Sequence, residues 1–284
     1  MKYFKFVLTA FALLMVPLPP EALAHPDVEI RIMAATERIE ADPDNASLLI
    51  ERGELHAEHG DWGKALRDFD LAAALDPTLS AVEFHRGRLL HSLGMSDEAE
   101  HALKKFLKHD ASSQRSITQT ALAHLLLGEL MESANRWERA AWHYDMGIKL
   151  SPGTNPGFYI ARARALVNAG AKNHDIAIKG LDDRLAAAPG IYSLLEYSVE
   201  LELDRDNVDG AISRIRRLVG VYPGLPHWRL RLAELQTAQG RSEDARRTYV
   251  EARKFIDGLP ERLRSKIYRS GLTADIESGL EGLE

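Results

Sequence analysis

Cysteine is absent from the 284-residue sequence. Its absence excludes disulfide bridges and thiolate chemistry. It also excludes a lipid-modified cysteine after a leader peptide. Long apolar runs are missing as well, because no stretch reaches the roughly 20 residues that a membrane-spanning helix needs. The mature chain is therefore expected to have neither a membrane span nor a lipid anchor.

The sequence also lacks the short motifs of common catalytic sites. It has no Gly-rich phosphate loop, no GxSxG elbow and no HExxH pair. An acidic stretch at 204–210 places Val208 and Asp209 where an EF-hand loop needs its third ligand and its glycine. The carboxylates Glu200 and Asp204 are expected to face solvent, with no desolvation to support acid–base work. These absences indicate a protein that is not an enzyme and holds no cofactor.

The segment 1–24 has the pattern of a secretory signal. Lys2 and Lys5 precede the apolar run 6–16, and Ala22-Leu23-Ala24 provides a small-residue cleavage site. This pattern predicts a cleaved signal peptide over residues 1–24 and a periplasmic or secreted bacterial protein. An uncleaved anchor is the alternative interpretation, although the apolar run is short for it.

Charge is weakly negative overall but uneven along the chain. Without residues 1–24 the chain has 34 Lys/Arg and 41 Asp/Glu, a net charge of −7, which argues against nucleic acid as a partner. Residues 25–110 have a net charge of −8, whereas residues 205–269 have +7. In a linear array this difference would become a charge asymmetry in space, unless it is only compositional drift on solvated surfaces.

A repeated phrase occupies most of the chain. Its small central residue recurs at spacings of 34, 41, 37, 34 and 34 in Ala65, Ala99, Ala140, Ala177, Ala211 and Ala245. A polar turn precedes each alanine, and an apolar or aromatic residue follows four positions later. Recurrence at this period predicts an array of stacked repeats.

One unit, residues 46–77, shows how the repeat is built. Apolar residues at helical spacing precede Gly60, which is placed to end a helix, and Asp61, which is placed to cap the next one. Pro77 then prevents the second helix from continuing. Small residues such as Gly53 and Ala65 allow two antiparallel helices to approach closely. The unit is therefore predicted to be helix, tight turn, helix and stop.

This unit resembles the tetratricopeptide repeat. Counted from Ala46, the family's small eighth and twentieth residues, aromatic twenty-fourth residue and closing proline are Gly53, Ala65, Phe69 and Pro77. In unit four Ala165 stands at the eighth position. Residues at equivalent structural positions in the later units include Gly87, Ala99, Gly128, Ala140, Tyr144, Pro152, Ala177, Pro189, Ala211, Pro223, Ala245 and Tyr249.

The resemblance implies an all-α fold, namely a right-handed α-solenoid of antiparallel helix pairs with capping helices. About six units are expected, at 46–79, 80–113, 121–154, 158–191, 192–225 and 226–259. Residues 25–45 are interpreted as a leading helix or a degenerate half-repeat, and residues 260–284 as one or two capping helices. Each unit buries a face of its neighbour, so stability is expected to come from the interfaces.

The resemblance also implies a binding surface, because in this family the first helices line a concave groove that grips a peptide or a partner helix. The residues of this chain at groove positions include Glu54, Glu58, Phe84, Arg88, His91, Glu129, Glu132, Tyr159, Arg162, Glu196, Glu200 and Glu234. The groove is largely acidic, which favours a protein or peptide partner with a basic segment. Alternatively, these carboxylates form only the solvated face of amphipathic helices. The expected function is a non-catalytic, exported scaffold.

Eleven histidines leave a second hypothesis open. Cleavage after Ala24 would make His25 the mature N-terminus, where its amine and ring nitrogen could bind Cu(II) together with another histidine. The alternative function is therefore a periplasmic metal-binding or metal-handling protein. The other histidines are expected to be packing or surface residues, since no metal-site signature accompanies them.

Overall fold

The computed structural model describes residues 26–108, 116–153 and 155–283, which form fifteen α-helices, one short 3-10 helix and no strand. The predicted signal peptide and His25 lie outside the described residues. The chain divides into two compact units, residues 1–109 and 110–284. The first unit contains α1 to α5 and the second α6 to α15.

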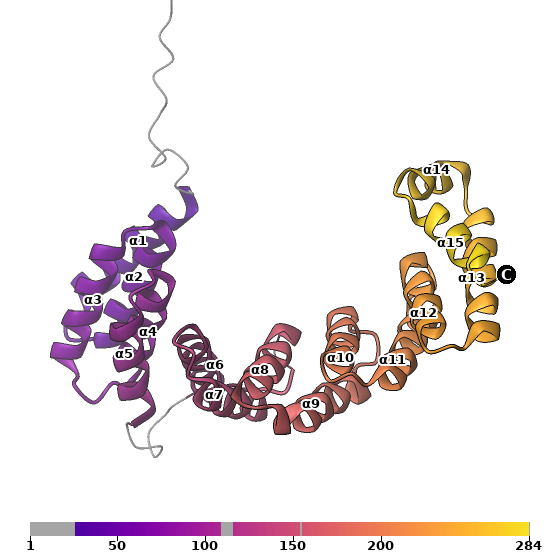
Figure 1. The fold of residues 1–284 in the computed structure, drawn as a ribbon. Coiled ribbons are helices and arrows are strands. Elements are labelled where there is room, and N and C mark those ends of the chain that lie inside the picture. The colour runs from indigo at the N-terminus through magenta and orange to yellow at the C-terminus, as the bar shows by residue number, and fades with distance from the viewer. Residues whose placement is uncertain (1–25, 109–115, 154, 284) are drawn as a thin grey trace, which may run out of the picture. The chain divides into compact units, whose positions relative to one another are not determined.

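In the first unit α1 (Pro26–Ala41) precedes two helix pairs. The pairs are α2 (Ala46–His59) with α3 (Trp62–Leu75), and α4 (Ala81–Ser92) with α5 (Ser96–Lys108). The helices of each pair run antiparallel across a short turn (Figure 1), and α1 packs against α2.

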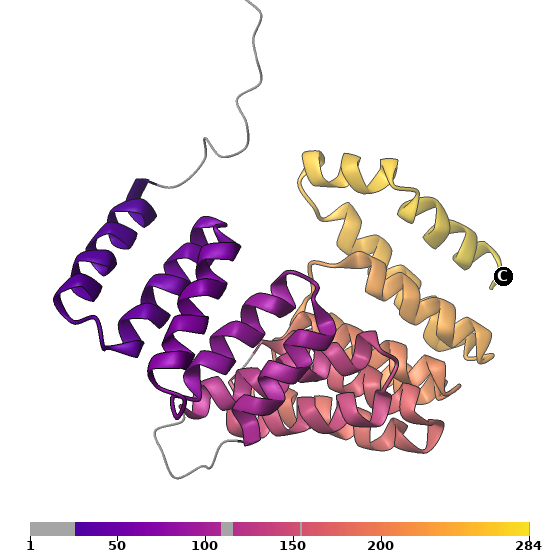
Figure 2. The same ribbon diagram turned by 90° about the vertical axis from the view of Figure 1, so that its left-hand side faces the viewer.

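The second unit continues the same design with four pairs and two closing helices (Figure 2). The pairs are α6 (Ile117–Ser133) with α7 (Trp137–Leu150), α8 (Pro156–Ala169) with α9 (His174–Ala187), α10 (Tyr192–Asp204) with α11 (Val208–Val221), and α12 (Pro226–Ala238) with α13 (Ser242–Asp257). A 3-10 helix, η2 (Ala171–Asn173), precedes α9. The closing helices are α14 (Glu261–Arg269) and α15 (Leu272–Glu281). The predicted all-α solenoid of helix pairs is confirmed.

Proline determines where the second helix of a pair ends. The helices α3, α7, α9 and α11 each end two residues before a proline, namely Pro77, Pro152, Pro189 and Pro223. The residue between helix and proline has an extended ψ of 66–90° in all four cases. The ring of a proline clashes with a helical conformation in the residue before it, so the helix stops there.

Small residues set the distance between the helices of a pair. The six alanines of the repeat have no exposed surface. A Cβ atom added to Gly53 would lie 2.6 Å from the Phe69 ring, and one added to Gly128 would lie 2.6 Å from the Tyr144 ring. At these positions only glycine lets the backbone of the first helix touch the aromatic ring of the second.

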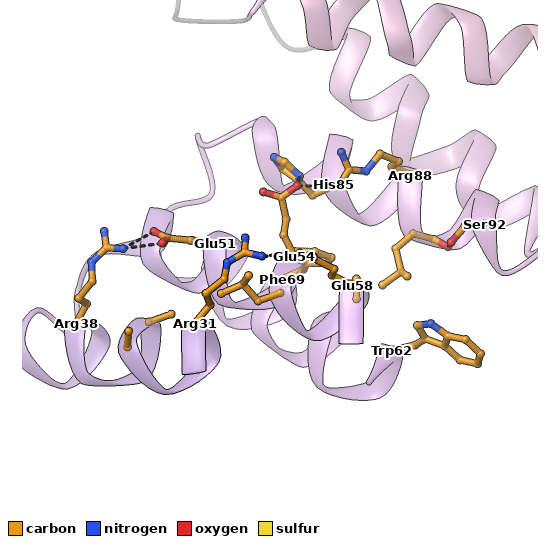
Figure 3. A pocket seen from close by; sticks show the side chains of 15 residues that line it. Arg31, Arg38, Glu51, Glu54, Glu58, Trp62, Phe69, His85, Arg88 and Ser92 are labelled. Carbon is orange, nitrogen blue, oxygen red and sulfur yellow. Dashed lines mark hydrogen bonds and ion pairs between the residues drawn. The ribbon is translucent and has the colours of Figure 1, made fainter. Parts of the chain in front are cut away.

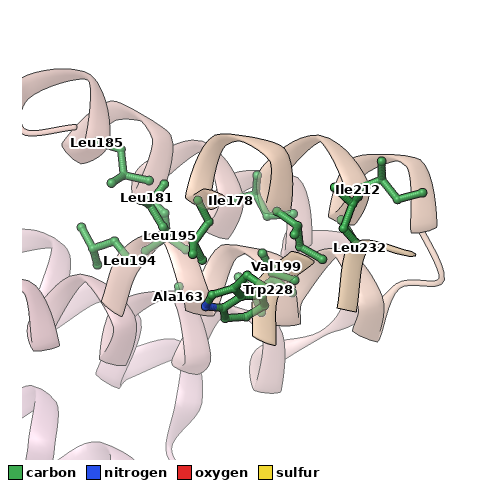
Figure 4. Close-up of a cluster of buried hydrophobic side chains, with 14 of the residues drawn as sticks. Ala163, Ile178, Leu181, Leu185, Leu194, Leu195, Val199, Ile212, Trp228 and Leu232 are labelled. Carbon is green, nitrogen blue, oxygen red and sulfur yellow. The ribbon is translucent and has the colours of Figure 1, made fainter. Parts of the chain in front are cut away.

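The largest apolar cluster runs through successive pairs of the second unit. It includes Ala163 of α8, Leu181 of α9, Leu195 of α10, Ile212 of α11 and Trp228 of α12, each at most 8% exposed (Figure 4). Because five consecutive helices share this cluster, no single pair encloses a core by itself. The stability of each pair therefore depends on its neighbours.

The pair α8/α9 departs from the expected register. Ala163, rather than Ala165, belongs to the buried cluster that contains Ala177 and Leu181. Ala165 instead belongs to the cluster around Tyr144 of the preceding pair. Ala163 and Ala177 are two positions further apart in the sequence than Gly53 and Ala65, the equivalent residues of the first pair. The turn that contains η2 takes up this difference, so the faces of α8 are displaced by two positions.

A partly buried ion-pair network links two helix pairs of the second unit. Glu202 of α10 is 4% exposed and accepts hydrogen bonds from Arg205, Asn207 and Arg214 at 2.7–2.9 Å. Arg214 of α11 also binds both carboxylate oxygens of Asp182 of α9, at 2.8 and 3.0 Å. The Arg214 guanidinium therefore joins α9, α10 and α11 through charge-assisted bonds.

Candidate functional site

A cavity of about 660 Å³ opens over α2 in the first unit. Figure 3 shows Arg31 and Arg38 of α1 on one side of it and His85 and Arg88 of α4 on the other. Trp62 lies at one end, with half of its surface exposed. The apolar lining comes from Ala34, Ala35, Leu55, Ala57, Phe69 and Leu89. The volume is in the range of small-ligand and peptide pockets.

The position of α1 in the repeat explains the arginines. Arg31 and Arg38 precede Ala65 and Ala72 by one repeat period, so they occupy the repeat positions of two alanines that are completely buried. Among the described residues no helix precedes α1 to cover this face. The side chains of Arg31 and Arg38 are therefore 49% and 55% exposed and reach sideways to α2. The absence of a small residue at these positions is what makes α1 a wall of the cavity.

Three glutamates of α2 pair with basic side chains of α1 and α4. Arg31 lies 3.2 Å from Glu58, and Arg38 lies 2.6 Å from Glu51. Glu54 lies 2.8 Å from the Nδ1 atom of His85 and 2.7 Å from Arg88. The hydrogen bond from His85 lowers the pKa of Glu54, although burial acts in the opposite direction. Glu54 is therefore ionised at neutral pH.

These ion pairs are exposed to water. Each glutamate and each arginine of the three pairs retains 37–55% of its side-chain surface. Pairs with this exposure stabilise a fold by at most about 1 kcal/mol. A ligand can therefore replace one partner of a pair at little cost in stability.

Some of the carboxylates expected in the groove are paired with a cation and others are not. Glu132 of α6 accepts hydrogen bonds from the Tyr144 hydroxyl, at 2.7 Å, and from Arg164 of α8. Along α10, by contrast, Glu196, Glu200 and Asp204 follow one another at four-residue spacing. Within the described part of the chain no cation lies within ion-pair distance of Glu200 or Asp204. Burial, and then the charges of Glu196 and Asp204, raise the pKa of Glu200.

Replacing Glu200 with glutamine is expected to stabilise the fold by a few tenths of a kcal/mol at pH 7, a small effect because the side chain is exposed. Its raised pKa means that the folded chain binds the proton more tightly than the unfolded chain. The destabilisation is therefore present at neutral pH and is lost as the pH falls toward about 4. Urea unfolding midpoints at both pH values measure the effect, with the exposed Glu243→Gln as control. A lower midpoint for Glu200→Gln at pH 7 would contradict it.

Three expected groove residues lie elsewhere. Phe84 is 2% exposed and packs its ring 5.3 Å from that of Phe106. The Tyr159 hydroxyl donates to the carbonyl of Pro152 at 2.7 Å, and Arg162 binds Asp145 of α7 at 2.9 Å. The displaced register of α8 explains the positions of Tyr159 and Arg162. Because of it, Arg164 and not Arg162 points toward α6.

The remaining expected groove residues are spread over several helices. Glu54, Glu58 and Arg88 come together in the cavity of the first unit. His91 of α4 and Glu129 of α6 are half-buried, and Glu234 of α12 is exposed and 3.3 Å from Arg231. Four residues that line the cavity were not predicted from the repeat pattern, namely Arg31, Arg38, Glu51 and His85. For the two arginines a signal was present, namely large charged residues at repeat positions that normally hold alanine.

The structure does not support the metal hypothesis. Over residues 26–108, 116–153 and 155–283 no group of three or more histidine or carboxylate side chains could hold a metal ion. His56 and His124 are buried at 8% and 7% exposure, and the Nδ1 atoms of His124 and His143 lie 3.1 Å apart. His25 lies outside the described residues. None of the described helices is long and apolar enough to cross a membrane.

A family model named tetratricopeptide repeat matches residues 84–155 and 199–258. These two segments of the chain are tetratricopeptide repeats. No curated protein sequence matches it. Among solved structures, a tetratricopeptide repeat protein called YrrB, described as having an unusual peptide-binding site, has a TM-score of 0.55 at 18% identity and covers 68% of this chain and 94% of its own.

Two further solved structures share the fold of this chain. The C-terminal part of a TPR protein from Cytophaga hutchinsonii has a TM-score of 0.62 at 16% identity, and covers 82% of this chain and 95% of its own. PilF of Pseudomonas aeruginosa has a TM-score of 0.54 at 17% identity, and covers 75% and 90%. At these identities the likeness shows the fold alone.

Proposed function

We propose that this chain is an exported, non-catalytic scaffold that binds a segment of a protein or peptide partner in the cavity over α2. The observation that carries the proposal is the lining of that cavity, in which exposed arginine–glutamate pairs surround an apolar floor. The match to tetratricopeptide repeats, a family of binding scaffolds, and the predicted signal peptide support the proposal.

The lining suggests how a segment would bind. An extended chain has free N–H and C=O groups, which match the carboxylates of Glu51 and Glu58 and the guanidinium groups beside them. An apolar side chain of the segment would reach the floor at Leu55 and Phe69, next to the exposed ring of Trp62. Because the existing ion pairs are weak, the segment can displace them.

The charge of the unit favours a basic segment. Residues 25–110 have a net charge of −8, which steers cations toward this part of the chain and repels acidic segments. A lysine or arginine of the segment would compete with Arg31 and Arg38 for the carboxylates of α2. The preferred ligand therefore combines an apolar anchor with one or two basic residues.

Selection of a phage-displayed library of random peptides on the purified chain tests the proposal. The selected peptides should be basic with an apolar anchor, and their affinity should fall at least about tenfold in the double variant Glu51→Lys/Glu58→Lys, which is about 1.4 kcal/mol. The control variant Asp97→Lys/Glu98→Lys makes the same charge change on exposed positions of α5 outside this cavity. Equal binding to the cavity variant and the wild-type chain would refute the assigned site.

A further inference from the structure

One face of α1 combines exposed apolar and acidic side chains. Ile30 and Met33 are 64% and 65% exposed, and Glu37 and Glu40 are exposed further along the same helix. The spacing of these four residues by three, four and three positions places them on one face. In the described part of the chain neither Glu37 nor Glu40 has an ion-pair partner.

The helix α14 has a face of the opposite charge. Arg262, Lys266 and Arg269 are exposed at four- and three-residue spacing, and Leu263 beside them is 51% exposed. Ile267, one helical turn after Leu263 at the edge of this face, packs against the apolar cluster that closes the second unit. Neither Arg262 nor Lys266 has an ion-pair partner among the residues that the structure describes. This basic face is therefore free to bind.

We propose that the α1 face of one copy of this chain docks on the α14 face of a second copy. In a parallel side-by-side arrangement one register brings Leu263 onto Met33 and, on the next turns, Lys266 and Arg269 onto Glu37 and Glu40. The two faces thus match in both their apolar and their charged residues. Opposite charges across such a contact favour association and repel a pairing of like faces.

The contact joins two different surfaces, so it is heterologous. Each copy has one α1 face and one α14 face, and association can therefore continue into a chain of copies or close into a ring. The α14 helix is only about 13 Å long at 1.5 Å per residue, so the contact area is far below the roughly 800 Å² per partner of a stable interface. The association is therefore weak, concentration-dependent and sensitive to salt.

Sedimentation velocity on the purified chain tests the proposal. The average mass should rise with protein concentration at low ionic strength and return to that of one chain in about 1 M salt, where charges are screened beyond about 3 Å. Two variants each remove one face, Glu37→Lys/Glu40→Lys and Arg262→Glu/Lys266→Glu. Each variant alone should stay monomeric, with an unchanged thermal unfolding midpoint, because all four residues are exposed. The variant Asp97→Lys/Glu98→Lys should associate like the wild-type chain.

Mixing the two variants distinguishes this contact from a symmetric one. The first variant then has two basic faces and the second two acidic faces, so an equimolar mixture should form species larger than two chains, whereas a symmetric contact would stop at two. A single chain with all four charge reversals should associate again. A wild-type chain that stays monomeric at every concentration, as an intramolecular pairing would give, would overturn the proposal. So would a mixture that forms no complex.

Discussion

Replacing Tyr144 with alanine is expected to lower the free energy of unfolding by about 3–5 kcal/mol, the usual loss for a large aromatic residue removed from a core. Tyr144 has no exposed surface, and its ring contacts the backbone of Gly128 closely enough to exclude a Cβ atom there. Its hydroxyl donates to Glu132 at 2.7 Å. The substitution therefore leaves a cavity between α6 and α7. It also removes a hydrogen bond that the half-buried carboxylate of Glu132 accepts.

Two companion variants separate these contributions. Tyr144→Phe keeps the ring and loses only the bond to Glu132, so we expect a loss of about 1.5 kcal/mol, typical of a hydrogen bond to a charged group. Arg139→Ala, at an exposed position of the same helix, should change stability by less than about 0.5 kcal/mol. Urea unfolding followed by circular dichroism at 222 nm measures all three. A Tyr144→Ala midpoint close to that of Arg139→Ala would show that the contact between α6 and α7 at Tyr144 does not stabilise the unit.

Replacing Glu202 with alanine is expected to destabilise the chain by about 3 kcal/mol at pH 7. The substitution takes one carboxylate partner from each of Arg214 and Arg205, and removing one member of a buried ion-pair network is costly. Asp182 still binds Arg214 and Asp175 still binds Arg205 in the variant, which keeps the expected loss at the lower end of the range for such pairs. Unfolding midpoints in urea measure the loss, with Glu243→Ala as an exposed control.

The effect of Glu202→Ala should depend on pH. Burial alone would raise the pKa of Glu202, but the hydrogen bonds from Arg214, Arg205 and Asn207 outweigh it and lower the pKa. A carboxylate with a lowered folded-state pKa contributes stability that is complete above its unfolded pKa and is lost as the pH falls through the folded value. The difference between wild type and variant should therefore be largest near neutral pH and shrink below about pH 4. A difference that stays constant down to about pH 3 would refute this account.

The helix pairs and their ends were predictable because they depend on local chemistry repeated at a fixed period. A glycine such as Gly60 in the left-handed conformation and a proline such as Pro77 act on their immediate neighbours, whatever the rest of the chain does. The buried alanines were predictable for a related reason. A small residue that recurs once in every unit of the repeat must face the same kind of contact each time.

The register of α8 was not predictable in the same way. The turn before α9 is longer than the equivalent turns, and an insertion there can displace either helix of the pair. In the first unit the small residue of the first helix lies 12 positions before the small residue of the second. The same spacing before Ala177 predicts that Ala165 packs against α9, whereas in the structure Ala163 does so. The same displacement moves Arg162 to Asp145 and Arg164 to Glu132. Only the choice of which alanine fits against Leu181 decides between these registers.

By itself the sequence determined that the chain is an array of antiparallel helix pairs, where most helices end and which small residues lie between the helices of most pairs. Those properties follow from backbone conformation and from the size of single side chains. Only the tertiary structure decided which charges of the predicted groove are neutralised and where the cavity opens. Long side chains such as those of Arg31, Arg88 and Arg164 reach partners on neighbouring helices, and their reach depends on packing that no repeat period encodes.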